Sequence, residues 1–518
     1  HIVCKLVKKM VSNEIYTGSG ASVTLIPEME FIISEGFGTT KGSVNLLERD
    51  STTKTTLKWT VNNSSRLVPD IYKGCMAKIE KYNASGTSLS DPETLLIKSN
   101  TEGTLVFAHN LDTDSDPRWY KCTILSFGTP IYSPAAIGGK PSLLADNWLG
   151  LVETFTPPTI TPQVKQLNLA LGGTRNFGFQ FHGSEDIGEA SIDVSLNNGS
   201  WLYYALGKMS YGANQVNTKT LNASLENGTA YGLTSNGSKI YRVEDSKILP
   251  PIDAGETKTN YKQITGDVTY TFSENDSGDL PSFALEVTNE KGNVTDANYF
   301  QDTNKERLMS HIYTGCQVNT LTLNFEEGQE VKASVSAQAR KAHRTENNYT
   351  PKRKVRTVSS LFNYPSDVND NTPYMYSDGT LKMYGQTLGR VKSGSVTIAN
   401  TLTPHKYIGN YDRTITTAHT AGQRTYEIQL TLMITDRTIW DELRKQTETN
   451  DTSSNDVLIE IEFAKSDTDK ITLKFNDYIT TAVDVPFPTD KGPLEVSITA
   501  QARTLNTCEY TGKWIIQG

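Results

Sequence analysis

Two short segments, far apart in this chain, are almost the same. Residues 335–340 read Val-Ser-Ala-Gln-Ala-Arg, and residues 498–503 read Ile-Thr-Ala-Gln-Ala-Arg. Each segment follows a strand-like run, Leu321–Phe325 in the first case and Ile471–Phe475 in the second. The pattern predicts that one β-unit occurs twice.

Two fainter matches lie upstream in the same order. Phe179–Gly183 is similar to Leu381–Gly385, and Ser191–Val194 is similar to Ser395–Ile398. Four collinear matches predict a duplicated β-domain. Tandem copies of one small β-unit are typical of the building blocks of symmetric assemblies rather than of enzymes.

The 518 residues are too many for one hydrophobic core and suggest roughly two to four domains. We predict an N-terminal β-rich decoration domain over residues 1–140, because this part matches neither copy. The first copy then spans 141–350 and contains an insertion, 208–266, rich in Asn, Gly, Ser and Thr. The second copy spans 351–518, and we expect the basic segment 341–356 that joins them to be exposed.

Strand patterns dominate, so the predicted fold class is all-β with minor α. Period-two alternation marks half-buried strands. The predicted strands are Ser43–Leu47, Thr56–Val61, Thr104–Ala108, Ala190–Leu196, Gln317–Phe325, Val331–Arg340, Ser395–Ile398, Thr425–Met433 and Val457–Phe463. Two helices are predicted, Asp436–Thr447 from its N-cap and apolar face and, with a weaker pattern, Asp302–His311.

The net charge of −8 argues against a general nucleic-acid binder, which would normally have a basic surface. An acidic balance still suits a channel through which DNA passes without binding, since such a lining repels phosphates. No apolar run approaches the roughly 20 residues needed to cross a bilayer, and we expect no membrane partner. The start at His1 is compatible with a processed end or with an unusual start upstream of Met10.

The five cysteines are too sparse for a disulfide framework. Cys75 and Cys122 share the N-terminal region, so they either form a disulfide or remain buried thiols.

No motif for nucleophilic, phosphate-binding or metal-dependent chemistry is present, and we predict neither an enzyme nor a cofactor. The best metal candidate is Asp112–Asp116, with carboxylates at alternate positions as in some calcium loops. Pro117 stands where such a loop needs Gly, and Thr123 stands where it needs Glu. A solvated turn is therefore the preferred interpretation.

Acceptor motifs for N-glycosylation recur along the chain, and several fall in predicted turns. The candidate residues are Asn62, Asn63, Asn83, Asn198, Asn222, Asn227, Asn236, Asn275, Asn293, Asn348 and Asn450. Such motifs also arise by chance in a chain rich in Asn, Ser and Thr, so modification remains open.

One stretch resembles the major tail tube proteins of tailed viruses. It contains Leu280–Phe283 and then Tyr313–Leu323, which reads Tyr-Thr-Gly-Cys-Gln-Val-Asn-Thr-Leu-Thr-Leu, followed by the turn Glu326–Gln329. Trp148–Glu153, Gly173–Phe177, Ser191–Leu196, Tyr204–Gly207, Val391–Leu402 and Gly422–Arg424 are also similar to strands of that family. The first 140 residues and the insertion depart from its pattern.

The resemblance implies that each copy is a β-sandwich with a flanking helix, and that both lend strands to a continuous inner barrel. Three chains would then form a homotrimeric, pseudo-hexameric ring. Stacked rings in the virion tail would enclose the tape-measure protein and viral DNA and would contact other tail proteins. Candidate strands for the lumen are Thr425–Met433 and hairpins with turns at Asn197-Asn198 and Asn400-Thr401.

Two alternatives remain at this point. A glycosylated surface or spike protein with tandem β-sandwiches would use abundant Tyr and Asn to bind carbohydrate. A β-rich glycosidase with paired carboxylates is the weaker alternative, because no such pair stands out from the general acidity. The sequence leaves open the host, tail contractility, the number of chains in a ring and the role of residues 1–140.

Overall fold

The computed structural model describes most of the chain in separate ranges. These are residues 21–28, 31–61, 70–89, 91–111, 119–125, 132–133, 142–143, 151–167, 178–211, 216–221, 232–233, 239–244, 247–248, 258–264, 267–275, 280–290, 308–344, 372–383, 386–388, 390–406, 418–433, 459–484 and 492–513. Strands occupy most of these ranges, which confirms the predicted all-β class with minor α.

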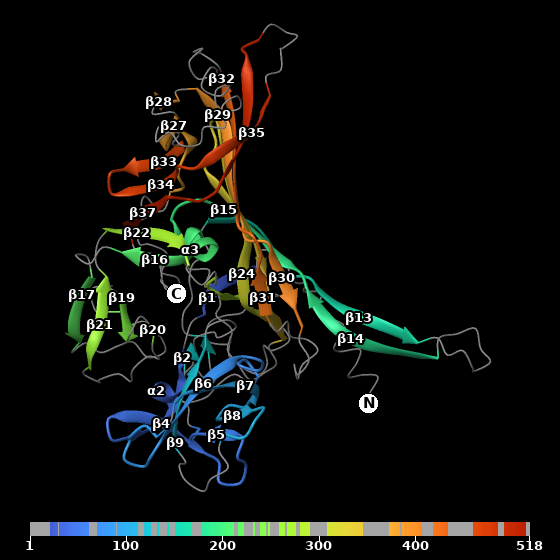
Figure 1. Cartoon of the computed structure of the whole chain (residues 1–518), viewed down its shortest axis with the longest axis vertical. Helices are drawn as coiled ribbons and strands as arrows, with labels where there is room; N and C mark the ends of the chain where they lie inside the picture. The colour runs from blue at the N-terminus through green and yellow to red at the C-terminus, as the bar shows by residue number, and fades with distance from the viewer. Residues whose placement is uncertain are drawn as a thin grey trace.

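The largest element is one long antiparallel sheet (Figure 1). Its main path runs β12-β15-β25-β24-β29-β32-β36-β35, and β1, β23 and β26 pair at the side. The bounds are β12 Leu151–Thr156, β15 Glu189–Ser195, β25 Lys332–Gln338, β24 Leu308–Glu326, β29 Val391–Ala399, β32 Thr425–Met433, β36 Glu495–Ala502, β35 Tyr478–Asp484, β1 Ala21–Pro27, β23 Phe283–Glu290 and β26 Lys341–Arg344.

A second sheet covers one face of the long sheet, in the order β16-β22-β37-β34-β33-β27-β28. Its bounds are β16 Gly207–Tyr211, β22 Asp267–Glu274, β37 Thr507–Lys513, β34 Asp469–Phe475, β33 Ile459–Ser466, β27 Gly379–Met383 and β28 Gln386–Thr387. The alternate apolar residues of both sheets share one core with helix α3 (Ser200–Leu206), whose Trp201, Leu202 and Tyr204 are buried. Because one face of each long-sheet strand enters this core, the other face is left to polar residues.

The N-terminal residues form a second core around the sheet β2-β9-β6-β7-β8-β5-β4-β3. Its elements are β2 Phe31–Ile32, α2 Ile33–Phe37, β3 Thr39–Lys41, β4 Val44–Arg49, β5 Thr56–Lys58, β6 Met76–Tyr82, β7 Glu93–Asn100, β8 Thr104–Phe107 and β9 Trp119–Ile124. This core also includes Ala284 and Ile312 of the long sheet. The strand β1 lies within the first predicted domain but pairs with β23, so the N-terminal residues are joined to the long sheet.

Two hairpin arms and two small strand groups complete the described structure. One arm is β13 (Ile160–Leu167) with β14 (Phe179–Ile187), and the other is β30 (Leu402–His405) with β31 (Ala418–Ala421). The predicted insertion contributes β16 and a five-stranded sheet of its own. The remaining elements are β17 Val216–Leu221, β18 Gly232–Leu233, β19 Lys239–Glu244, β20 Lys247–Ile248, β21 Lys258–Ile264, β10 Tyr132–Ser133, β11 Ser142–Leu143 and the 3-10 turn η7 Tyr376–Asp378.

Several local predictions need correction. The weaker helix candidate is wrong over residues 308–311, which belong to β24, and its other residues lie outside the described ranges, as does Asp436–Thr447. The start of the joining segment is not exposed, because Lys341–Arg344 forms β26 against β24 and Lys341 is buried. Cys75 and Cys122 are both buried free thiols, so the disulfide alternative is wrong.

Two predicted lumen turns are also wrong. Asn197-Asn198 leads into helix α3 instead of closing a hairpin. Asn400-Thr401 is a kink between β29 and β30, held by an Asn400 side chain that donates to the carbonyls of Ala205 and Val318. Alternation in the sequence marks both strands of such a bent ribbon, but it does not reveal the bend.

Candidate functional surface of the long sheet

The long sheet is built from two runs of four strands with the same order of pairing. The first run is β12-β15-β25-β24 and the second is β29-β32-β36-β35. All pairs are antiparallel, and β24 pairs with β29 where the runs meet. In each run an arm extends from the first two strands: β13–β14 from β12 and β15, and β30–β31 from β29 and β32.

The irregularities of the pairing recur at the same places in both runs. The β12–β15 pair has its extra residue at Glu153, and the β29–β32 pair has it at Lys392. The β24–β25 pair has its extra residue at Asn319, and the β35–β36 pair has it at Thr481. The pairs β15–β25 and β32–β36 are regular. Bulges tend to be specific features of a fold, so their recurrence relates the runs residue by residue.

The Ala-Gln-Ala-Arg segments fix this relation. Gln338 in β25 lies opposite Glu189, and Gln501 in β36 lies opposite Glu427. The first run therefore matches β15 to β32 and β24 to β35. Of the four matches in the sequence, only the Ala-Gln-Ala-Arg pair occupies equivalent positions. The strand β15 does not correspond to β29, β24 lies in a different sheet from β34, and Phe179–Gly183 lies in the β14 arm whereas Leu381–Met383 lies in β27 of the second sheet.

The same ion pair occurs in both runs with its charges exchanged. The Glu153 carboxylate lies 2.8 Å from the Lys332 ammonium, and the Lys392 ammonium lies 2.8 Å from the Glu495 carboxylate. Both pairs cross the middle strand from the bulge to the third strand. Lys332 donates to Glu153 and so holds the pKa of that carboxyl below its ordinary value, while Glu495 raises the pKa of Lys392.

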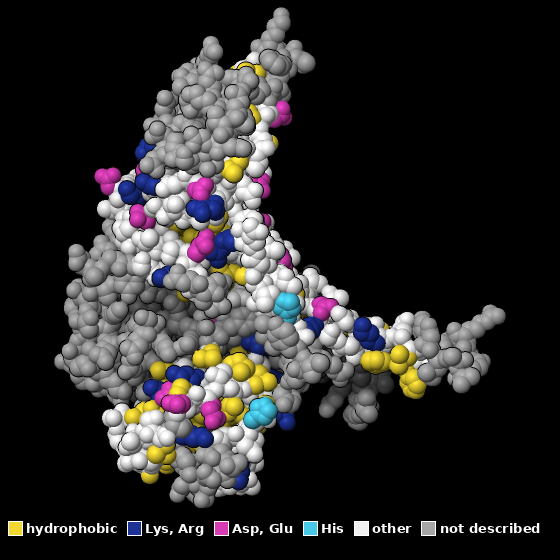
Figure 2. All heavy atoms as spheres, in the orientation of Figure 1, with side chains coloured by type: hydrophobic (Ala, Val, Ile, Leu, Met, Phe, Trp, Pro, Cys, Tyr) yellow, Lys and Arg dark blue, Asp and Glu magenta, His cyan; other side chains and the backbone are white. Residues whose placement is uncertain are grey.

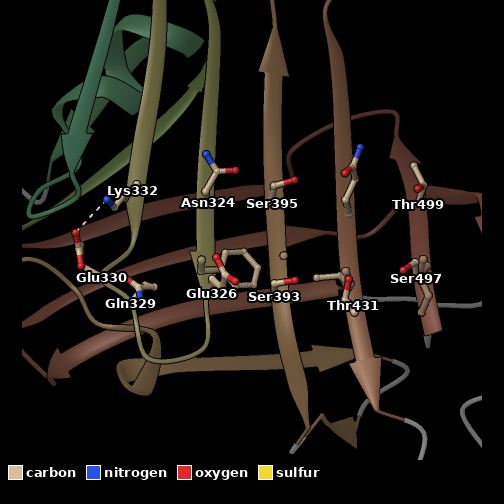
Figure 3. Close-up of a pocket in the computed structure, with 15 residues that line it drawn as sticks. Asn324, Glu326, Gln329, Glu330, Lys332, Ser393, Ser395, Thr431, Ser497 and Thr499 are labelled. Carbon is tan, nitrogen blue, oxygen red and sulfur yellow. Dashed lines mark ion pairs between the residues drawn. The ribbon is translucent and has the colours of Figure 1, made fainter. Parts of the chain in front are cut away.

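The face of the sheet turned away from the core is polar and hollowed. Figure 3 shows its side chains standing side by side on neighbouring strands, from Lys332 across to Thr499. Small hydroxyl and amide side chains line the hollow: Asn324, Ser393, Ser395, Gln429, Thr431, Ser497 and Thr499. Acidic residues outnumber basic ones on this face, with Glu153, Glu189, Asp193, Glu326, Glu427, Asp484 and Glu495 against the ion-paired Lys332 and Lys392.

The two end strands of the main path each have one partner. Within the described residues, β12 pairs only with β15 and β35 pairs only with β36. An unpaired strand edge exposes a row of backbone donors and acceptors and is a template for pairing with another chain. The free edges of β12 and β35 therefore indicate where another chain can pair, which the sequence alone does not reveal.

The comparison with protein-family models decides the family. Residues 170–502 match the model described as phage tail tube protein, which is more than half of the chain. The chain belongs to the phage tail tube protein family. Its place is therefore the virion tail, where it is a structural subunit of the tube. No curated protein matches the chain.

The predicted modification and metal sites fall mostly outside the described ranges. This holds for Asp112–Asp116 and for eight of the acceptor asparagines: Asn62, Asn63, Asn222, Asn227, Asn236, Asn293, Asn348 and Asn450. Asn83 and Asn198 both lie in turns, where their side-chain oxygens accept hydrogen bonds from Ser85 and Ser200. Asn275 follows β22, and glycosylation of all these residues stays a prediction.

The described residues hold no cluster of three or more His, Cys, Asp or Glu side chains placed to bind a metal ion. No helix in the described ranges has the length and apolar character needed to span a membrane.

Proposed function

We propose that each four-strand run, with its half of the second sheet, is one copy of a duplicated tube domain. The equal order of pairing, the recurring bulges and the exchanged ion pair support this proposal. The copies exchange elements across the boundaries near residues 140 and 350, because β1 joins the first copy and β37 pairs with strands of both. The N-terminal domain and the inserted sheet have no counterpart among the described residues of the second copy and decorate the tube.

Three such chains close a ring in which six copies alternate around the axis. The single observation that carries this proposal is the contact between β24 and β29 inside the chain. In the relation between the runs, β24 corresponds to β35 and β29 corresponds to β12. The free β35 edge of one chain can therefore pair with the free β12 edge of the next chain, as β24 pairs with β29 within one chain. Closure of all edges removes the sites at which sheets aggregate.

The polar face then lines the channel. Its hydroxyl, amide and carboxylate groups suit a conduit, because lysines and arginines bound to phosphates would retard DNA and hold it strongly at low salt. On the described strands of the main path, the basic side chains of this face, Lys332 and Lys392, are already paired with carboxylates. Stacked rings would thus carry the tape-measure protein before ejection and viral DNA during it, and the ends of the tube would contact other tail proteins.

Negative-stain electron microscopy of the purified full chain tests this function. We expect rings or hollow filaments with three-fold symmetry. Rings with six chains, or discrete particles without a channel, would contradict the alternating arrangement. A matched variant with Thr431→Lys and Thr499→Lys should still form rings, but should retain DNA in the channel at low salt, which the natural polar face should not.

A further inference from the structure

The β13–β14 arm carries an apolar face that no described residue of the single chain covers. Leu167 and Phe179 lie opposite each other in the ribbon, and Lys165 lies opposite Phe181, so the three apolar side chains share one face. The exposed fraction is 49% for Leu167, 62% for Phe179 and 47% for Phe181. Figure 2 shows hydrophobic side chains on the outer part of this arm, which projects from the body in Figure 1. An isolated two-stranded ribbon is only marginally stable in water, so this face needs a partner.

The corresponding arm of the second run has a partner within the chain. The β30–β31 arm lies on the first run, where His419 Nδ1 is 3.2 Å from the Gln317 side-chain oxygen. Its base is fixed to the β24 bulge, because the Asn400 and Leu402 backbone amides donate to the carbonyl and side-chain oxygens of Asn319, each at 2.8 Å. The arm of one run therefore packs on the edge strand of the neighbouring run.

The strand registers show which residue of the β13–β14 arm corresponds to His419 of the β30–β31 arm. Ala399 pairs with Thr425 as Ile160 pairs with Ile187, so the two arms leave the sheet in the same register. His419 lies opposite Pro404 in one arm, and Phe181 lies opposite Lys165 in the other. The pairing is interrupted after Pro162 in one arm and after Ala399 in the other, but each interruption leaves one more residue unpaired on the second strand than on the first. Phe181 therefore takes the position of His419.

The receiving residue follows from the Ala-Gln-Ala-Arg segments. Gln317 lies opposite Gln338 in the first run, and Ile479 lies opposite Gln501 in the second, so Ile479 takes the position of Gln317. Ile479 is 59% exposed in the single chain. The polar contact of His419 with Gln317 inside the chain thus corresponds to an apolar contact of Phe181 with Ile479, and both of these residues are exposed in the single chain.

We propose that the β13–β14 arm of one chain packs on β35 of a second copy in the same ring, with Phe181 on Ile479. This inference rests on the proposed ring, since it is the alternation of the two runs that brings β12 next to β35. The occupant is a second copy of this chain because the intrachain contact supplies a matching geometry, and because the two isolated apolar surfaces complement each other. The bulge at Thr481 then receives the base of the arm, as Asn319 does within the chain.

Disulfide cross-linking of assembled full-length protein tests the contact. All variants carry Cys4→Ser, and the other four cysteines are buried thiols. Chains with Phe181→Cys, mixed with chains carrying Ile479→Cys before assembly, should give a covalent dimer on mild oxidation, and neither chain alone should. A single chain with both substitutions should give dimers and a covalently closed trimer, because each chain then bonds to both neighbours.

Two controls make the result specific. Gln317→Cys with His419→Cys should form an intrachain disulfide, which verifies the equivalent contact inside the chain. Gln180→Cys with Ile479→Cys places one thiol on the opposite face of the arm and should cross-link at least tenfold less.

Electron microscopy of the same samples separates the possible failures. Rings without the Phe181–Ile479 cross-link would overturn this inference and leave the proposed function standing. A cross-link found in stacked tubes but missing from single rings would place the arm against the next ring and would also overturn it. Absence of rings under all conditions would overturn the proposed function together with the inference.

Discussion

Arg340 and Arg503 occupy equivalent positions in the two runs but lie in different surroundings. Arg340 is buried, and its guanidinium donates to the backbone carbonyl of Gly74 in the N-terminal domain. Arg503 is exposed and pairs with Asp477 at 2.5 Å. In the first run the Glu28 carboxylate accepts from the Gly315 amide beside Arg340. The arginine of this motif thus anchors the N-terminal residues in the first run and lies on the surface in the second.

The two arginines form a matched pair for mutation. Arg340→Ala should lower the free energy of unfolding by about 2–4 kcal/mol, because it removes a buried charged donor and leaves carbonyl groups without a partner. Arg503→Ala should cost less than about 1 kcal/mol, as expected of an exposed ion pair. Chemical denaturation of the full chain, followed by tryptophan fluorescence, measures both. Equal losses would contradict the difference in burial.

The exchanged ion pair permits a charge-swap test. Glu153→Lys should lower the thermal midpoint by about one to three degrees, because it sets two ammonium groups side by side. Adding Lys332→Glu should restore the midpoint in part, since the first run then has the arrangement of Lys392 and Glu495, although the new carboxylate lies beside Glu330. The carboxyl pKa of Glu153 lies below its ordinary value of 4.5, so the pair contributes fully above that pH and is lost as pH falls through the lowered pKa. Failure of the double variant to recover would show that the two pairs are not interchangeable.

At the scale of elements, the sequence predicted strands well and their partners poorly. Thr425–Met433 is β32 with the predicted bounds, because clean alternation marks a strand with one buried face. The weak match of Ser191–Val194 to Ser395–Ile398 was wrong, since short β-branched runs resemble each other wherever they lie. The bulges, the kinked arms and the exchanged charges depend on register, which alternation alone does not fix.

The contact between the β30–β31 arm and β24 should depend on pH. Burial, together with the nearby charges of Arg340 and His405, lowers the pKa of His419 to about 4. Because this value lies below the ordinary 6.5, the contact is fully stable above pH 6.5 and weakens as the pH falls from 6.5 to about 4. Hydrogen exchange of residues 418–421 should therefore accelerate over that window in the natural chain. His419→Gln should remove the pH dependence that comes from this group, and an unchanged profile would contradict it.

At the scale of the whole molecule, the membership in the tail tube family explains why so few residues carry recognisable chemistry. As the proposed lining of the channel, the polar face needs only small uncharged or acidic side chains, and many sequences satisfy that requirement. Pairing at the β12 and β35 edges uses exposed backbone groups, so it requires no recognisable sequence motif. The resemblance in the sequence identified the family, whereas the relation between the two runs required the strand order.

Electron cryomicroscopy of assembled tubes tests the central claim most directly. We predict rings of three chains, with β35 of each chain paired to β12 of the next and with Ser395, Gln429 and Thr499 facing the channel. Six chains in a ring, or a channel lined by a different surface with this polar face turned outward, would contradict the alternating arrangement of the two copies.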